Sequence, residues 1–407
     1  MNYASFLSLS LLACPLAAQI VPGDIAVTGF STSEFAVINA GTATTITTPG
    51  FGGATSQSIL FDPFNPLDVL VGGFGFVGRA TVAGPGVVLY TPLTTAVGTA
   101  AQMSWLSSTE IVIADAGTDQ VRLLTTSGTL TDLSSGTQPW GTSINAGACD
   151  PATASVVVGG NGSLHRLLIG APVATTIATG LGGFVSNVSF DPCNGDVLAT
   201  VLGVNRLVRV DAAGTVTDEI APGIVTAPNS FDIDENGSYL IGAAGGNVFL
   251  VPPGGTTATP VGSFSGLGSS TSGLAYVGAN SCSYGAGCAG PTGVPNLELS
   301  GAVYAGSPLT TVSDNHTPGA IGVAVFGLSA AAPPVALDPI LGTSGGCELL
   351  VSADLLDAGL TDAAGNFVHV IQTVPAFANL RLYVQHAVIE GAGLSSFSLS
   401  QARTIRF

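Results

Sequence analysis

Six polar but uncharged residues recur at nearly even spacing through the first two thirds of the sequence. They are separated by 41 to 45 residues, and each stands at the start of an apolar run typical of a β-strand. Side chains that hydrogen bond without charge suit a neutral ligand such as a sugar or a peptide, and they do not compensate a divalent cation for its lost water. The alternative is that they cap strand ends and hold water. The six are Gln57, Gln102, Asn145, Ser186, Asn229 and Ser272.

Residues for acid–base or metal chemistry are scarce at the corresponding positions. Asp232 is the only acid inside one of these strands, and we expect it to pair with an arginine of a neighbouring repeat. His165 lies on a later strand of its repeat, so we expect it to pack rather than to transfer protons. The turn 234–237 lacks the ligand count of a dedicated calcium loop, so we expect no cofactor, with calcium as the weaker alternative. The other histidines, His316, His369 and His386, follow the repeats.

The cysteines predict disulfides. Five of the six follow the leader segment described below, so one thiol is left over. Cys149 and Cys193 occupy corresponding turns of adjacent repeats, and they can pair if their Cα atoms lie within about 7 Å. Cys288 with Cys347 is the favoured second pair, and Cys282 with Cys288 is its rival. The spacing does not match a four-ligand zinc pattern.

The composition excludes whole classes of function. The 407 residues include eight arginines and no lysine, against 25 acids, which gives a net charge of -17. A nucleic-acid-binding protein needs a cationic surface, and so does a protein that adheres to anionic membranes through charge. The 46% of hydrophobic residues can bury a core, while the 56 glycines and 24 prolines disfavour long helices. The chain is therefore expected to be an all-β protein.

The N-terminus has the pattern of a secretory leader. Residues 4–18 are apolar but too few to span a bilayer, and small residues precede Gln19. We expect a signal peptide at 1–18 with cleavage after Ala18. The alternatives are a lipoprotein anchored at Cys14, although Pro15 disfavours that processing, and a buried N-terminal strand. No later apolar run is long enough for a transmembrane helix, so the mature protein is expected to be secreted or to sit at the cell surface.

The elements that would position the six polar residues form a repeat. An Asp-Pro turn such as Asp62-Pro63 or Asp191-Pro192 is followed by an apolar run, a third run and a Thr-rich fourth run. Four short strands at this period make the antiparallel blade of a β-propeller. The count over residues 20–278 is six blades, with five or seven as alternatives.

The two ends of the repeat region predict how the ring closes. The first unit, starting at residues 24–29, lacks a first strand, and residues 272–278 supply an unmatched one. Pairing of these segments would close the ring and remove two sheet edges.

The third runs support a family resemblance. The segments IADAGTDQVRL at 113–123 and NRLVRVDAAG at 205–214 resemble the NHL repeat, and the region is similar to the gluconolactonase-like and streptogramin-lyase-like six-bladed propellers. Gluconolactonase-like enzymes hold calcium or zinc with acidic and Asn ligands at the channel mouth. Asn229 resembles their Asn position, but the acidic partners do not appear. Arginines at matching third-strand positions are expected to hydrogen bond between blades; they are Arg79, Arg122, Arg166 and Arg209.

The remaining chain has a different texture. Residues 279–295 are rich in Gly, Ser and Cys and read as a linker, and residues 296–407 predict a small β-sandwich that resembles modules appended to secreted bacterial proteins. We expect a secreted, monomeric binding propeller whose channel mouth recognises a glycan, a peptide or a cell-surface component. The alternative is a lactonase-like hydrolase or a lyase. A neutral mouth favours the first, and converging acids would favour the second.

Overall fold

The protein is described from a computed structural model. The structure describes residues 20, 23–30, 32, 34–39, 42–47, 56–65, 68–84, 87–142, 144–150, 153–171, 173–220, 222–263, 270–278, 280–301, 308–341, 346–372, 380–391 and 396–406. The predicted leader at 1–18, with Cys14 and the Ala18–Gln19 junction, lies outside them.

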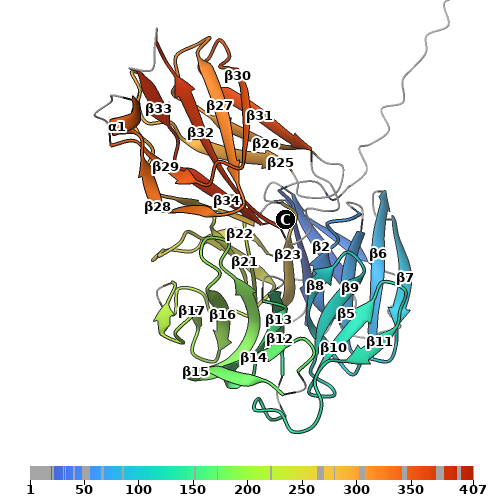
Figure 1. Ribbon diagram of the computed structural model, residues 1–407. Helices are drawn as coiled ribbons and strands as arrows, with labels where there is room; N and C mark the ends of the chain where they lie inside the picture. The colour runs from blue at the N-terminus through green and yellow to red at the C-terminus, as the bar shows by residue number, and fades with distance from the viewer. Residues whose placement is uncertain are drawn as a thin grey trace, which may run out of the picture.

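Six antiparallel four-stranded blades form the first part of the chain, in line with the predicted count (Figure 1). The first strands of neighbouring blades contact one another, so they are the innermost. From inside outward, blades 1 to 3 are β23 (Thr271–Tyr276), β1 (Ile25–Gly29), β2 (Glu34–Asn39) and β3 (Thr42–Thr47); β4 (Ser56–Phe61), β5 (Asp68–Gly73), β6 (Phe76–Gly84) and β7 (Val87–Thr94); and β8 (Ala100–Ser107), β9 (Glu110–Asp115), β10 (Gln120–Thr125) and β11 (Leu130–Asp132).

Blades 4 and 5 share one long strand. The first half of β15 is the outer strand of blade 4, and its second half is the inner strand of blade 5. Blades 4 to 6 are β12 (Ala146–Asp150), β13 (Ser155–Gly159), β14 (Asn161–Leu168) and β15 (Thr175–Phe190); β15, β16 (Val197–Leu202), β17 (Arg206–Val210) and β18 (Val216–Asp218); and β19 (Ser230–Ile233), β20 (Tyr239–Gly242), β21 (Asn247–Val251) and β22 (Thr259–Ser263).

The ring is closed as predicted. β23 pairs antiparallel with β1, and the register sets Ile25 opposite Tyr276 and Val27 opposite Leu274. Both strands are largely buried, so the closure joins two apolar surfaces as well as two sheet edges.

Glycine at the end of a second strand has a packing reason. A Cβ atom on Gly72 would lie 2.7 Å from Ser58 Oγ and 2.8 Å from the Cβ of Ala100 in the next blade. This contact explains why apolar second runs end in glycine where blades converge on the axis.

The recurrent arginines bind acids of their own blade, so the prediction that they bond mainly between blades is wrong. Arg79 lies 3.2 Å from Asp62 and 3.1 Å from Asp68 of blade 2. Arg122, Arg166 and Arg209 likewise reach carboxylates in the turn or strand beside them, and Arg122 adds a bond to the Ala96 carbonyl. The third strand pairs with the second strand of its own blade, so its arginine lies beside acids of that blade.

The C-terminal region contains two larger sheets that share a core. One has the order β24 (Asn280–Tyr284), β34 (Ala402–Arg406), β32 (Arg381–Ile389), β27 (Ile321–Gly327) and β30 (Leu355–Leu360), with β33 (Phe397–Leu399) beside β32; the other is β25 (Leu297–Gly301), β26 (Pro308–Ser313) and β31 (Phe367–Gln372). Leu299, Phe326 and Phe367 pack between them. The C-terminal region also contains a hairpin of β28 (Ala330–Ala336) and β29 (Glu348–Val351) and the short helix α1 (Asp338–Leu341). We call residues 280–406 the C-terminal module.

The module begins earlier than predicted. Residues 280–284, expected in a linker, form β24 and pair with β34 near the end of the chain. The Gly- and Ser-rich composition obscures this strand, in which Ser281 and Cys282 are both buried.

Two disulfides are present in the part of the chain that the structure describes. Cys288 pairs with Cys347, as favoured, which rules out the rival pair of Cys282 with Cys288. Cys193 pairs with Cys282 of β24, and Cys149 is a buried free thiol, so the expected pair of Cys149 with Cys193 is wrong. Cys149 lies within β12, whereas Cys193 lies two residues past Asp191 in its turn, so the two do not occupy equivalent sites.

Candidate functional site

The six predicted polar residues all lie where inner strands begin. Gln57, Ser186 and Ser272 occupy β-bulges, Gln102 follows one directly, and Asn145 and Asn229 immediately precede β12 and β19. A bulge inserts one residue and redirects its side chain. The repeat therefore gives all six the same place at the start of an inner strand, and their binding of a ligand stays a prediction.

Several of these side chains hydrogen bond to the neighbouring blade, so their polar groups are already occupied within the protein. Ser186 Oγ donates to the carbonyl of Pro228 at 3.2 Å, and Ser272 Oγ donates to the carbonyl of Ser56 at 3.3 Å. An inner strand has one unpaired edge of N–H and C=O groups, and these hydroxyls satisfy part of it.

Gln102 braces the channel between three blades. From β8 of blade 3, its Nε2 donates to the Val188 carbonyl of blade 5 at 2.7 Å. Its Oε1 accepts from the backbone N–H of Gly147 in blade 4 at 3.0 Å and from that of Val188 at 3.1 Å. The amide is thus largely used by the protein itself, and little of it remains for a ligand.

Replacing this amide should destabilise the propeller. We expect Gln102→Leu to lower the free energy of unfolding by about 1–3 kcal/mol, because it leaves backbone groups of Gly147 and Val188 without partners. Urea denaturation measures the effect. The control Gln57→Leu, at a partly exposed bulge, should change stability by about 0.5 kcal/mol or less. Equal effects of the two substitutions would contradict the brace.

A cavity of about 210 Å³ lies against the inner strands and extends toward their C-terminal ends. We call it the channel-base pocket. Of the six predicted residues, only Gln102 and Ser272 line it. Its lining combines apolar and polar side chains and includes six aromatic rings. Trp105 donates its indole N–H to the Phe61 carbonyl at 2.9 Å and packs edge-on against Phe64 at 5.3 Å between ring centroids.

The last strand of the chain closes one side of this pocket. Figure 1 shows β34 running from the C-terminal module toward the propeller, where it ends near β23. Arg406, at its end, lines the pocket, donates to the Cys149 carbonyl at 3.3 Å and lies over the Phe190 ring at 5.5 Å from its centroid. Burial lowers the pKa of the Arg406 guanidinium from its usual value, and the positive charge of Arg381 adds to this. Sequence reasoning missed Arg406, because it follows the repeats.

Asp232 is the acid of the pocket, and its expected pairing with an arginine is wrong. Its Oδ2 accepts from the backbone N–H of Tyr276 in blade 1 at 2.8 Å, and its Oδ1 accepts from its neighbour Ile233 at 2.9 Å. Asn280 of β24 donates a longer bond of 3.4 Å. Burial raises the pKa of Asp232 to about 7, so near neutral pH the carboxyl is part protonated.

The pocket contains no group poised as a nucleophile among the described residues. Burial raises the pKa of the Cys149 thiol to about 12, so the reactive thiolate is scarce. His165 lies on the third strand β14, as predicted, between Ser163 at 2.8 Å and Thr176 at 3.1 Å. It does not line the pocket.

A Ser–His–Glu arrangement occurs in the C-terminal module but is enclosed. Ser313 Oγ lies 2.8 Å from His316 Nε2, and His316 Nδ1 lies 3.4 Å from Glu390. Ser313 also contacts His386 Nδ1 at 2.9 Å. All four residues are buried, so this network connects the two sheets and is closed to a substrate.

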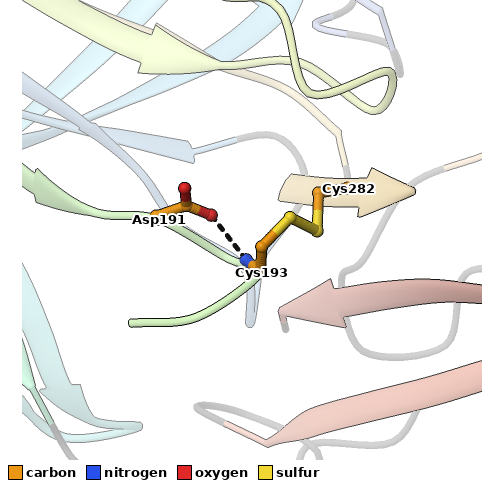
Figure 2. Close-up of side chains that lie close together, drawn as sticks. All are labelled: Asp191, Cys193 and Cys282. Carbon is orange, nitrogen blue, oxygen red and sulfur yellow. Dashed lines mark hydrogen bonds between the residues drawn. A yellow bond between two sulfur atoms is a disulfide. The ribbon is translucent and has the colours of Figure 1, made fainter. Parts of the chain in front are cut away.

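One cluster of potential metal ligands among the described residues consists of a disulfide and an ion-paired carboxylate. Figure 2 shows Asp191 beside the disulfide of Cys193 and Cys282. Sulfur atoms joined in a disulfide are not thiolate ligands. Asp191 accepts from the Cys193 N–H at 2.6 Å and pairs with Arg209. The cluster therefore fastens the propeller to the module.

Comparison with known proteins supports the fold and leaves the function open. No family model and no curated protein matches the chain. A chain of the crystal structure of a nidogen/laminin complex matches with a TM-score of 0.51 at 11% identity, over 61% of this chain and 97% of that one. Virginiamycin B lyase from Staphylococcus aureus matches with a TM-score of 0.42 at 13% identity, over 54% and 73% of the two chains. An auxiliary nutrient binding protein from Bacteroides thetaiotaomicron matches with a TM-score of 0.42 at 14% identity, over 58% and 64%.

The likeness to the chain of the nidogen/laminin complex supports the β-propeller fold and nothing further. Sequence identities of 11–14% do not indicate a shared function, and β-propellers host many activities. The described residues include no helix long and apolar enough to cross a membrane. The two disulfides indicate an oxidising, extracellular-type environment.

Proposed function

We propose that the chain is a secreted binding protein that holds a small ligand in the channel-base pocket, with a C-terminal β-sandwich module that completes the site. The observation that carries this proposal is the composition of the pocket: aromatic walls from the propeller meet Arg406 from the module. Aromatic and apolar walls with placed polar groups are typical of ligand sites. Ligands that the module helps to hold would also stabilise its contact with the propeller.

The alternative of a propeller enzyme receives less support. Among the described residues that line the pocket, Asp232 is the only carboxylate and histidine does not occur. A lactonase-like metal site requires several converging acids, and a lyase requires a placed acid or base. The neutral ligand first expected at the strand starts is also less favoured, because Gln102, Ser186 and Ser272 are engaged between blades.

Filling the pocket tests the proposal. A screen of glycans, peptides and small metabolites by thermal shift should identify compounds that raise the melting temperature of the wild-type protein. Ser189→Phe, at a partly exposed position in the pocket wall, should abolish the response. The matched control Ser127→Phe, in an exposed hairpin turn, should retain it. Hits that are unaffected by Ser189→Phe would place the binding site elsewhere.

Secretion is tested separately. We expect the exported protein to begin at Gln19, because the leader ends in small residues before it. N-terminal sequencing checks this expectation. An acylated Cys14 at the start of the mature chain would replace it with the lipoprotein.

A further inference from the structure

The arginines of this acidic protein fall into two groups. The five propeller arginines each lie within ion-pair distance of a carboxylate; they are Arg79, Arg122, Arg166, Arg206 and Arg209. The three module arginines, Arg381, Arg403 and Arg406, have no carboxylate at that distance among the described residues. Arg381 and Arg406 are register partners on β32 and β34. Three positive charges are therefore gathered in the module without a carboxylate at ion-pair distance among the described residues, and Asp232 and Asp150 act on Arg406 only from farther away.

Only one of these side chains combines free donors with access to the pocket. Arg403 donates to the carbonyls of Leu297 and Glu235, each at 2.6 Å, and thereby anchors the module. Arg406 makes a single long hydrogen bond of 3.3 Å, although a guanidinium has five N–H donors. The Arg406 guanidinium lies over the ring of Phe190. The unused hydrogen-bonding capacity of Arg406 thus lies in the pocket.

Two other polar side chains of the pocket are engaged, whereas Asn187 Oδ1, also in its lining, has no hydrogen-bond partner among the described residues. Asp232 already accepts from Tyr276 and Ile233, and Gln102 is held by two backbone segments. A ligand that uses the free donors of Arg406 would supply an acceptor, and a carboxylate matches a guanidinium with two parallel hydrogen bonds. The aromatic rings of the lining offer contacts to an apolar group beside that acceptor. A cavity of about 150 Å³ admits benzene, so one of about 210 Å³ has the volume for a ring.

We propose that the channel-base pocket binds a small carboxylate that carries an aromatic or apolar group. Its carboxylate accepts hydrogen bonds from Arg406, and its apolar group packs among Phe61, Trp105 and Phe190. This inference rests on the proposed function, since it names the ligand class of the same pocket.

Titration calorimetry of the full mature chain at pH 8 tests the inference with 3-phenylpropionate and its neutral amide, 3-phenylpropanamide. We expect the acid to bind at least tenfold more tightly than the amide. Arg406→Gln should remove this preference and leave amide binding within twofold. The matched control Arg206→Gln removes the same charge from an ion pair with Asp218 on the propeller surface, and it should preserve the preference.

A second variant keeps the test decisive if Arg406→Gln fails to fold. At pH 8, Asp232→Asn removes a negative charge from the pocket, so it should tighten binding of the acid severalfold and leave that of the amide unchanged. Amide binding equal to that of the acid, sensitive to Ser189→Phe, would overturn the carboxylate inference while the pocket stands. Failure of both compounds to bind overturns it as well. The proposed function fails only if the wider screen also yields nothing that Ser189→Phe blocks.

Discussion

Removing β23 should abolish the cooperative folding of the propeller. A chain of residues 20–263 lacks the inner strand of blade 1, and with it the buried side chains Leu274 and Tyr276. Each large apolar side chain contributes roughly 1.5–3 kcal/mol when buried. The open edge of β1 would also be free to pair with other chains. We expect aggregation and a broad unfolding transition, measured by light scattering and urea denaturation.

The matched control is a chain of residues 20–278, which keeps β23 and lacks the C-terminal module. Cys193→Ser in both chains removes the thiol that has lost Cys282 as its partner. We expect the longer chain to be monomeric and to unfold cooperatively. A shorter chain with the same stability as the longer one would contradict ring closure as a source of stability.

Acid should weaken the C-terminal module through His386. This side chain is fully buried, and burial lowers its pKa to about 3, with like charge from His369 and His316 adding to the effect. The unfolded chain protonates this histidine near pH 6.5, while the folded chain does not until about pH 3. Stability is therefore fully present above about pH 6.5, and it falls by up to about 1.4 kcal/mol per pH unit as the pH decreases toward 3.

Comparison with His386→Gln isolates this contribution. Relative to wild type, the variant should gain roughly 3 kcal/mol in free energy of unfolding between pH 7 and pH 4, whatever its difference at pH 7. Asp232→Asn is a control of opposite sign. The raised pKa of Asp232 costs stability as the pH rises from about 4 to 7, so its replacement should help most at pH 7. Parallel pH profiles for wild type and His386→Gln would contradict the account.

The propeller was predictable because its signals are local and repeated. The Asp turns, the apolar second runs and the unmatched strands at both ends define six blades and their closure. The partners of the arginines were not predictable from the sequence. Whether an arginine binds an acid of its own blade or of the next blade depends on strand register. Arg79 lies opposite Leu70 on β5, two residues from Asp68, and this neighbourhood is set by pairing within the blade.

The site was only partly predictable for a related reason. Spacing places the six polar residues at the starts of inner strands, but it does not reveal that Gln102 reaches Gly147 and Val188 across the channel. Arg406 belongs to no repeat, and it reaches the channel only because β34 pairs with β24 beside the disulfide to Cys193. Contacts between distant segments depend on packing that a periodic pattern does not encode.

A crystal structure of the full mature chain with 3-phenylpropionate tests the central claim most directly. We predict the ligand in the channel-base pocket, with its ring against Trp105 and Phe190 and its carboxylate within hydrogen-bond distance of Arg406. A ligand bound at the strand starts around Gln57 and Asn145, or a pocket that stays free of ligand at saturating concentration, would contradict a binding site built jointly by the propeller and the C-terminal module.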